Sequence, residues 1–294
     1  MQPIQLGRMR VHKVHEMDSP VPLLSQLPGT TADDMRRLLG WYDQPDEVNA
    51  DPETSFMTFS VHSWVIEIDG KTILIDTCCG NDKQREILPD VHMLKTDYLG
   101  NLRRAGFAPE DIDLVMCTHL HFDHVGWNTK LENGKWVPTF PNARYLLSKP
   151  EFQHWNSATD EVKSMSSAVT FDDAVTPLFE FGVVDLVEMD HRVSDTVELV
   201  PTPGHSPGHV SVRISSQGET AFITGDCVHS AVQLAEPDWH TMVDSDGAMS
   251  SATRRELIAE YADQPVLIIG THFPPPTAGH LVITEKGVRF QPLQ

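Results

Sequence analysis

The sequence predicts an α+β fold made of two β-rich halves. Two stretches, about 56–75 and 183–224, are rich in β-branched residues and alternate between apolar and polar positions. Each stretch is followed by segments with helical periodicity. Because each sheet must bury an apolar face, this order of elements indicates two halves that enclose one site. The chain has 294 residues, 40% of them hydrophobic and 22% charged, which is enough for a sizeable core.

The chain begins with a possible strand over 9–16, followed by an extension over 17–55 that is rich in Pro, Asp, Gly and Thr. Within the extension, Thr31 and Asp34 resemble a capping box at the start of a helix over 31–40. We expect 1–294 to be a single domain, in which the extension covers the site or forms the contact of a homodimer.

Both halves contain clear strand and helix patterns. In the first half, the Asp69-Gly70 turn joins two strands, and the carboxylate of Asp76 should emerge where the second one ends. The predicted elements of the first half are strands over 56–68 and 72–75, a helix over 93–105, strands over 112–117 and 143–147, a helix over 148–156 that opens with a Ser148–Glu151 capping box, and a helix over 171–180. The predicted elements of the second half are strands over 183–188, 196–201, 210–215 and 220–224, a helix over 250–262, and a final strand over 266–269.

The densest chemical signal is the segment 118–126, which directly follows the predicted strand over 112–117 and has the spacing His119-x-His121-x-Asp123-His124. Imidazole and carboxylate are the ligands of zinc and other first-row metals. A protein core seldom gathers so many titratable groups. The first two histidines can point the same way from an extended segment, while the Asp-His pair lies past a turn. The arrangement therefore suits two neighbouring metals.

Three further side chains with metal-binding groups follow predicted strands, namely His205, Asp226 and His272. Strand ends are rigid, so ligands at these positions are held with little loss of loop entropy. Together with the four residues of the cluster they make seven candidates, which exceeds the four ligands of a closed structural zinc site. Two metal ions with open coordination positions fit this number better.

The cluster is followed in order by Pro-Gly-His205, Gly-Asp226 and Gly-Thr-His272, and this pattern resembles the metallo-β-lactamase-fold hydrolases over roughly residues 56–285. The resemblance implies a four-layer αββα sandwich with a dinuclear metal site between its sheets. By the family pattern, one metal is held by His119, His121 and His205, the other by Asp123, His124 and His272, and Asp226 bridges both. Zinc is the first choice of metal, with iron, manganese or cobalt as alternatives.

Within this superfamily the chain looks most like lactonases and the methyl-parathion-hydrolase group, because 119–124 and 203–209 are similar to the lactonase versions of these segments. Acyl-homoserine lactonases usually carry a tyrosine three residues after the bridging aspartate, where this chain has His229. A small lactone or a carboxylic ester is therefore the expected substrate, without the acyl-homoserine lactones being singled out. His209 lies past a tight Pro-Gly turn and is interpreted as structural.

The implied reaction is hydrolysis by a hydroxide that bridges two metals about 3.5–4 Å apart. His229 would hydrogen-bond the developing oxyanion or protonate the leaving oxygen, and Asp123 is the other candidate for moving a proton. Asp76 would hydrogen-bond a ligand histidine, with a surface turn as the alternative interpretation. Trp127 and Phe273 would line the substrate pocket, or belong to the core.

Several other functions use the same residues. An organophosphotriester hydrolase or a β-lactamase could be built on the same dinuclear site. A sulfur dioxygenase would need a single iron, and a non-catalytic binding module is the remaining alternative, although such modules usually lack ligands. A glyoxalase-type thioesterase is disfavoured because no basic C-terminal cluster is present to hold a glutathione carboxylate.

Charge and cysteine usage limit the partners. Lys and Arg number 22 against 42 Asp and Glu, so the net charge is −20, which argues against nucleic acid and anionic membranes as partners. The four cysteines form no Cys-x-x-Cys pair, which is typical of a reducing compartment. The N-terminus lacks the apolar core of a signal peptide. We therefore expect a cytoplasmic protein.

Overall fold

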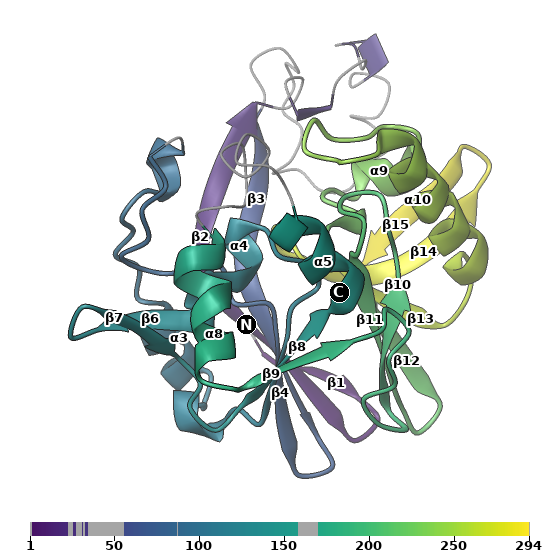
Figure 1. The fold of residues 1–294 in the computed structure, drawn as a ribbon. Coiled ribbons are helices and arrows are strands. Elements are labelled where there is room, and N and C mark those ends of the chain that lie inside the picture. Colours follow the sequence, from purple (N-terminus) through teal and green to yellow (C-terminus); the bar gives the residue numbers. More distant parts are fainter. Residues whose placement is uncertain are drawn as a thin grey trace. The chain divides into compact units, whose positions relative to one another are not determined.

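The computed structural model describes residues 2–22, 26–27, 31, 33–34, 56–86, 88–157 and 170–293 (Figure 1). Most of the 17–55 extension lies outside the described residues, together with the cover or dimer contact expected there. At the start of the expected helix, the Thr31 amide donates to the Asp34 carboxylate (3.0 Å) and the Asp34 amide donates to Thr31 Oγ1 (3.2 Å). These two bonds form the predicted capping box.

The chain divides into two compact units. Unit 1 comprises residues 1–17 and 61–191, and unit 2 comprises residues 18–60 and 192–294. Each unit is built on one mixed sheet accompanied by helices. The predicted α+β class is therefore confirmed.

The sheet of unit 1 has the strand order β1-β2-β3-β4-β5-β8-β9. The strand predicted over 183–188 in the second half therefore belongs to the first sheet, where β9 pairs with β8. β3 and β4 form the predicted antiparallel hairpin, whereas β4, β5, β8 and β9 are parallel. Ile75 at the end of β4 is paired with Met116 at the end of β5, so the residues that follow these two strands emerge at the same sheet edge. The strands are β1 (Ile4–Leu6), β2 (Met9–Pro22), β3 (Phe56–Ile68), β4 (Lys71–Ile75), β5 (Leu114–Met116), β8 (Arg144–Ser148) and β9 (Val184–Val187).

The helices of unit 1 depart from the sequence prediction in two places. The helix expected over 93–105 begins only at Tyr98, because Met93 has φ +53° and the Thr96 amide bonds the Asn81 side chain instead of a helical carbonyl. The expected Ser148–Glu151 capping box is wrong, since the Glu151 carboxylate instead accepts from the Leu120 amide and the Trp155 indole. The remaining elements are α3 (Tyr98–Arg104), α4 (Phe122–Val125), the hairpin β6 (Thr129–Glu132) and β7 (Lys135–Pro138), α5 (Lys149–Ser157), the π-helix η5 (Phe171–Val175) and α8 (Thr176–Glu180), with short 3₁₀ turns η1 (Pro89–Val91), η2 (Pro109–Asp111) and η3 (Gly126–Asn128).

The sheet of unit 2 has the order β10-β11-β12-β13-β14-β15, with β12 and β13 parallel and the other neighbours antiparallel. The prediction that 266–269 is the final strand is wrong. A hairpin of β14 and β15 follows it, with Glu285 and Lys286 as its turn. The elements are β10 (Val197–Pro201), β11 (Val210–Ser216), β12 (Glu219–Ile223), η6 (Gly225–Cys227), α9 (Val232–Ala235), α10 (Gly247–Tyr261), β13 (Val266–Ile269), β14 (Ala278–Thr284) and β15 (Gly287–Pro292).

Each unit has its own apolar core of buried side chains. All four cysteines are buried and free, so no disulfide joins any of them. No helix in the described part of the chain combines the length and the apolar character needed to cross a membrane.

Candidate metal centre

In unit 1, the histidine cluster is divided by the start of α4. His121 is the N-cap in extended backbone (φ −70°, ψ 159°), and His119 lies two residues before it. Asp123 and His124 belong to the first turn of the helix. The predicted change of direction between the two halves of the cluster is thus a strand-to-helix turn.

Main-chain bonds hold this turn against the segment that follows β4. The Thr77 amide donates to the His124 carbonyl (2.7 Å), and the Gly126 amide donates to the Cys78 carbonyl (2.7 Å). A Cβ at Gly126 would lie 1.8 Å from the Cys79 carbonyl oxygen, so only glycine permits this close approach. Gly126, which ends the motif, therefore allows the close backbone contact that positions the histidines.

Asp76 is the shared acceptor behind two of these histidines. Its Oδ2 lies 2.9 Å from His124 Nδ1 and 2.9 Å from Thr118 Oγ1, and Thr118 Oγ1 lies 3.1 Å from His119 Nδ1. A carboxylate only accepts, so His124 Nδ1 carries a proton and the Thr118 hydroxyl donates to Asp76. The hydroxyl oxygen then accepts from His119 Nδ1. In its neutral form, each imidazole then has an unprotonated Nε2.

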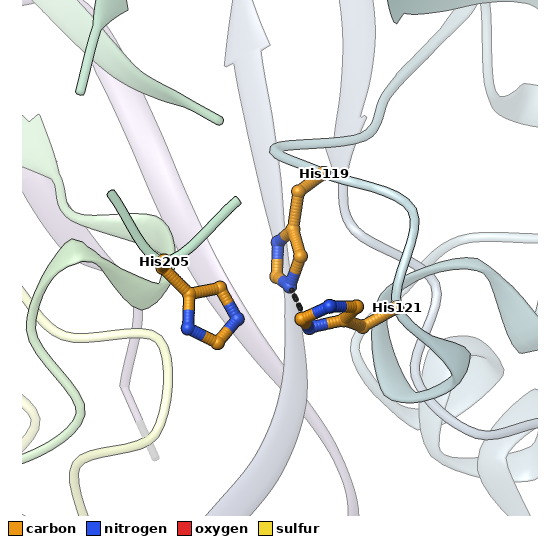
Figure 2. A group of neighbouring side chains, drawn as sticks. All are labelled: His119, His121 and His205. Carbon is orange, nitrogen blue, oxygen red and sulfur yellow. Dashed lines mark hydrogen bonds between the residues drawn. The ribbon is translucent and has the colours of Figure 1, made fainter. Parts of the chain in front are cut away.

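Those Nε2 atoms face other ligand-type atoms. His124 Nε2 lies 3.7 Å from Asp123 Oδ2. His119 Nε2 lies 2.9 Å from His121 Nδ1, and Figure 2 shows the two rings meeting at these nitrogens. In the neutral ring, a lone pair of His124 thus faces a carboxylate oxygen. Two acceptors that face each other repel, and a cation bound between them makes the arrangement favourable.

Unit 2 contains an equivalent arrangement around His205. Its Nδ1 lies 3.1 Å from Asp244 Oδ1, and its Nε2 lies 3.5 Å from Asp226 Oδ2. Because Asp244 accepts a hydrogen bond from Nδ1–H, Nε2 of the neutral ring again presents a lone pair to a carboxylate oxygen. The side chain of Asp244 is 0% exposed. Burial alone would raise its pKa, but the hydrogen bond from His205 and the charge of Arg254 outweigh this and lower it well below the usual value.

The sequence analysis did not identify Asp244. It follows no strand, and its segment carries no motif that would have marked it. The sequence did identify Asp76, because that residue directly follows β4.

Asp226 and His272 are placed by the register of two strands. Ile223 and Ile269 are paired across parallel β12 and β13, and each ligand candidate follows its isoleucine by three residues. His272 Nε2 lies 3.2 Å from Asp226 Oδ1. His209 holds this segment from behind, since its Nε2 accepts from the Asp226 amide (2.8 Å).

His229 lies against the same carboxylate, with Nε2 3.2 Å from Asp226 Oδ2. Its ring is parallel to that of His272 within 2°, with centroids 5.9 Å apart, and it stacks on Phe59 at 5.7 Å. Burial lowers the pKa of His229, although the negative charge of Asp226 acts in the opposite direction. Burial therefore favours the neutral form of the ring.

The two aromatic residues expected in the substrate pocket are packed inside their units. Trp127 is 5% exposed, stacks on Tyr98 at 5.4 Å, and donates from Nε1 to Glu16 Oε1 (2.6 Å). Phe273 is 0% exposed and meets Phe290 edge-on at 5.3 Å. Both rings belong to the core in this structure, which was the alternative interpretation of each.

The donor sets fit divalent metal ions. Each unit presents unprotonated imidazole nitrogens and carboxylate oxygens, which suit zinc and other first-row metals. In each unit a further carboxylate holds the far nitrogen of a histidine, an arrangement that orients metal-binding imidazoles.

Comparison with known proteins identifies related chains. The family model described as the metallo-beta-lactamase superfamily matches residues 57–272. An N-acyl homoserine lactonase of Bacillus cereus is 24% identical over 253 residues, covering 81% of this chain and 88% of that protein. A probable metallo-hydrolase of Methanocaldococcus jannaschii is 30% identical over 171 residues, covering 58% of this chain and 68% of that protein.

Two solved structures have similar folds. One, described as the hydrolase AbOPH in the beta-lactamase superfamily, has a TM-score of 0.81 at 23% identity and covers 100% of this chain and 97% of its own. The other, described as AidC, a dizinc quorum-quenching lactonase in complex with a product, has a TM-score of 0.78 at 22% identity, with the same coverage of 100% and 97%.

Proposed function

The chain belongs to the metallo-beta-lactamase superfamily, and from this premise we propose that it is a metal-dependent hydrolase that opens small lactones or cleaves carboxylic esters. The predicted metallo-β-lactamase fold is thereby confirmed. One observation supports the metal: in each unit, a histidine donates a hydrogen bond from Nδ1–H to a buried carboxylate, and its Nε2, which carries a lone pair in the neutral ring, faces a second carboxylate.

We propose that two ions are held by the seven side chains found in the sequence. One ion would be held by His119, His121 and His205, the other by Asp123, His124 and His272, with Asp226 bridging them. When bound, such ions polarise a carbonyl oxygen and lower the pKa of a water molecule towards neutrality. Zinc is the first choice, which agrees with the dizinc lactonase named among the similar structures.

The chain's own residues would orient these ligands and move the proton. Asp76 and Asp244 accept hydrogen bonds from Nδ1–H of His124 and His205, so that Nε2 of each neutral ring can offer its lone pair to a metal. We propose Asp123 and His229 as the groups that hold the proton and return it to the leaving oxygen. His229 is suited to this because its neutral ring can give up one N–H and accept a proton at the other nitrogen.

The names of the relatives support the substrate class. Six of the relatives that match most of this chain are N-acyl homoserine lactonases of Bacillus, so these lactones belong in the first assay alongside other lactones and aryl esters. The four buried, free thiols agree with the proposed cytoplasmic location. The homodimer formed through 17–55 likewise remains a proposal.

The test combines metal analysis with a substrate panel. We expect the purified protein to bind two divalent ions and to hydrolyse a lactone or an ester, with activity removed by a chelator and restored by zinc. Asp226→Asn should abolish turnover, whereas the control His191→Ala should not. Turnover of only a phosphotriester or a β-lactam would overturn the substrate class, and one iron with oxygen consumption would indicate the dioxygenase instead. Undiminished activity after complete metal removal would overturn the metal mechanism.

A further inference from the structure

We propose that Asp244, anchored by Arg254, is the positioning residue of His205: it fixes both the orientation of the ring and the nitrogen that carries the proton. The proposal rests on the proposed function only in treating His205 as a metal ligand. The hydrogen bond from His205 Nδ1 to Asp244 Oδ1 is 3.1 Å long, and both side chains are almost fully buried. In this state Nε2 alone is available to a metal.

The segment that carries Asp244 also holds the main chain of the histidine. The Ser245 amide donates to the His205 carbonyl (2.9 Å), and the Asp246 amide donates to the Gly204 carbonyl (2.9 Å). Ring and backbone are therefore fixed by three consecutive residues. A ring held at both ends has little freedom to rotate away from a bound ion.

Helix α10 supports the same loop from behind. A Cβ at Gly204 would lie 2.3 Å from the Ser250 amide nitrogen, so the loop and the first turns of the helix are in direct backbone contact. The Thr253 hydroxyl donates to the Pro203 carbonyl at 2.6 Å. The side chain of Asp246 accepts from the Met249 amide (2.9 Å) and so caps the helix.

Arg254, on α10, joins Asp244 to the segment after Asp226. Its side chain is 0% exposed, and its Nη1 lies 3.8 Å from Asp244 Oδ2 and 3.2 Å from the Cys227 carbonyl oxygen. Further bonds run from Nε to the Pro237 carbonyl (3.0 Å) and from Nη2 to the Trp239 carbonyl (3.1 Å). A buried carboxylate without a cation would be costly, so the guanidinium keeps Asp244 ionised and able to accept.

The contacts of Asp244 favour positioning over direct metal binding. Ligand atoms of His205, His229 and Asp244 lie within 4.8 Å of one another, which would also allow a metal. However, Oδ1 accepts a hydrogen bond from His205 Nδ1–H, while Oδ2 accepts one from the Thr241 amide (3.1 Å) and faces Arg254. Both oxygens are thus engaged within the protein.

The experiment measures the His205 ring proton directly, in the full chain as purified and labelled with ¹⁵N-histidine. We expect a solvent-protected Nδ1–H signal that disappears in His205→Gln and in Asp244→Ala. Asp244→Asn keeps an oxygen acceptor and should retain the signal. The matched control Asp246→Ala removes a carboxylate two residues away, so it should lower Tm through the lost helix cap but leave the signal unchanged.

Metal competition with a chelator separates this proposal from the proposed function. We expect Asp244→Ala to weaken binding of one of the two ions about 10- to 100-fold and to lower kcat more than KM, with smaller losses in Asp244→Asn. A signal that persists in Asp244→Ala overturns the positioning role, whatever metal is bound. If the signal is lost but metal affinity is unchanged, Asp244 holds the ring and His205 is not a ligand, which contradicts the proposed function instead. Loss of both ions in Asp244→Ala would overturn the assignment to a single histidine.

Discussion

Unit 1 and unit 2 each hold a histidine between two carboxylates, but they assemble this arrangement in different ways. In unit 1, Asp76 serves His124 directly and His119 through Thr118. In unit 2, Asp244 accepts a hydrogen bond from His205, and it lies in a loop that helix α10 supports. One carboxylate therefore controls two rings in the first case and one ring in the second.

The difference follows from how far apart the residues lie in the sequence. The unit 1 histidines occupy one short segment, so the carboxylate at the end of the neighbouring parallel strand can reach two of them. The unit 2 candidates follow separate strands or loops, so each needs its own support. In unit 1 the candidate ligands are positioned by their spacing along the sequence, whereas in unit 2 they are positioned by packing between distant segments.

The largest predicted effect comes from removing the shared acceptor. Asp76→Ala should lower metal affinity and kcat/KM by about 100-fold, at the upper end of the range for residues that orient metal ligands, because two rings lose their support. The loss should exceed that of Asp244→Ala. Chelator competition and steady-state kinetics measure it, with Asp90→Ala as an exposed control in the same unit. Equal losses in the two variants would contradict the comparison drawn above.

The next effect concerns the glycine that lets the unit 2 loop approach α10. Gly204→Ala should lower the free energy of unfolding by about 1–3 kcal/mol, because φ is +133° and the new Cβ would meet the Ser250 backbone. Gly218→Ala is the matched control, since its φ is +86° but its surroundings are open. Denaturant unfolding measures both. A cost at Gly204 no larger than at Gly218 would show that the contact with α10 is unimportant.

A smaller loss is expected when only the indirect part of the unit 1 network is removed. Thr118→Val keeps the shape of the side chain and the hydrogen bond that His124 donates to Asp76, but it removes the hydroxyl between Asp76 and His119. We expect metal affinity to fall about 10-fold, the lower end of the same range. Thr118→Ser, which keeps the hydroxyl, should behave as the wild type. If both variants bind metal normally, Asp76 acts through His124 alone.

A different kind of effect concerns the pH dependence of stability. Unit 1 contains a buried lysine, Lys83, which donates to Thr129 Oγ1 and the Asp173 carbonyl, both at 2.7 Å. Burial lowers its pKa from 10.5 to about 7, although the charge of Asp173 acts in the opposite direction. Between these values the unfolded chain binds more protons, so this group makes the free energy of unfolding rise with pH, by at most about 1.4 kcal/mol per pH unit.

Lys83→Met should remove this contribution, so that stability rises less steeply between about pH 7 and pH 10 than in the wild type. The bidentate pair of Arg85 and Asp173 (2.7 and 2.9 Å) remains in the variant and keeps the carboxylate compensated. Denaturant unfolding at a series of pH values measures the slope. Parallel curves for the two proteins would mean that the lysine is protonated in the folded state throughout this range.

Sequence patterns located most elements because they depend on local chemistry. The alternation over 56–68 and the apolar run over 266–269 gave strands with the same bounds in the structure. The helix expected from Met93 begins later than the local pattern predicts, because the Thr96 amide donates a hydrogen bond to the side chain of Asn81. The last hairpin was missed because the residues of Ala278–Thr284 alternate only in part between polar and apolar and follow a Pro-rich stretch.

The sequence by itself determined the family, the α+β class and the position of each candidate metal-binding side chain relative to a strand, because spacing and strand ends are local properties. Only the tertiary structure decided which groups support those side chains. Asp244 reaches His205 because α10 places it there, and the indole N–H of Trp127 is satisfied inside the core because Glu16, from a strand far earlier in the chain, accepts its hydrogen bond. Such contacts join residues that are distant in sequence, so no local pattern could have specified them.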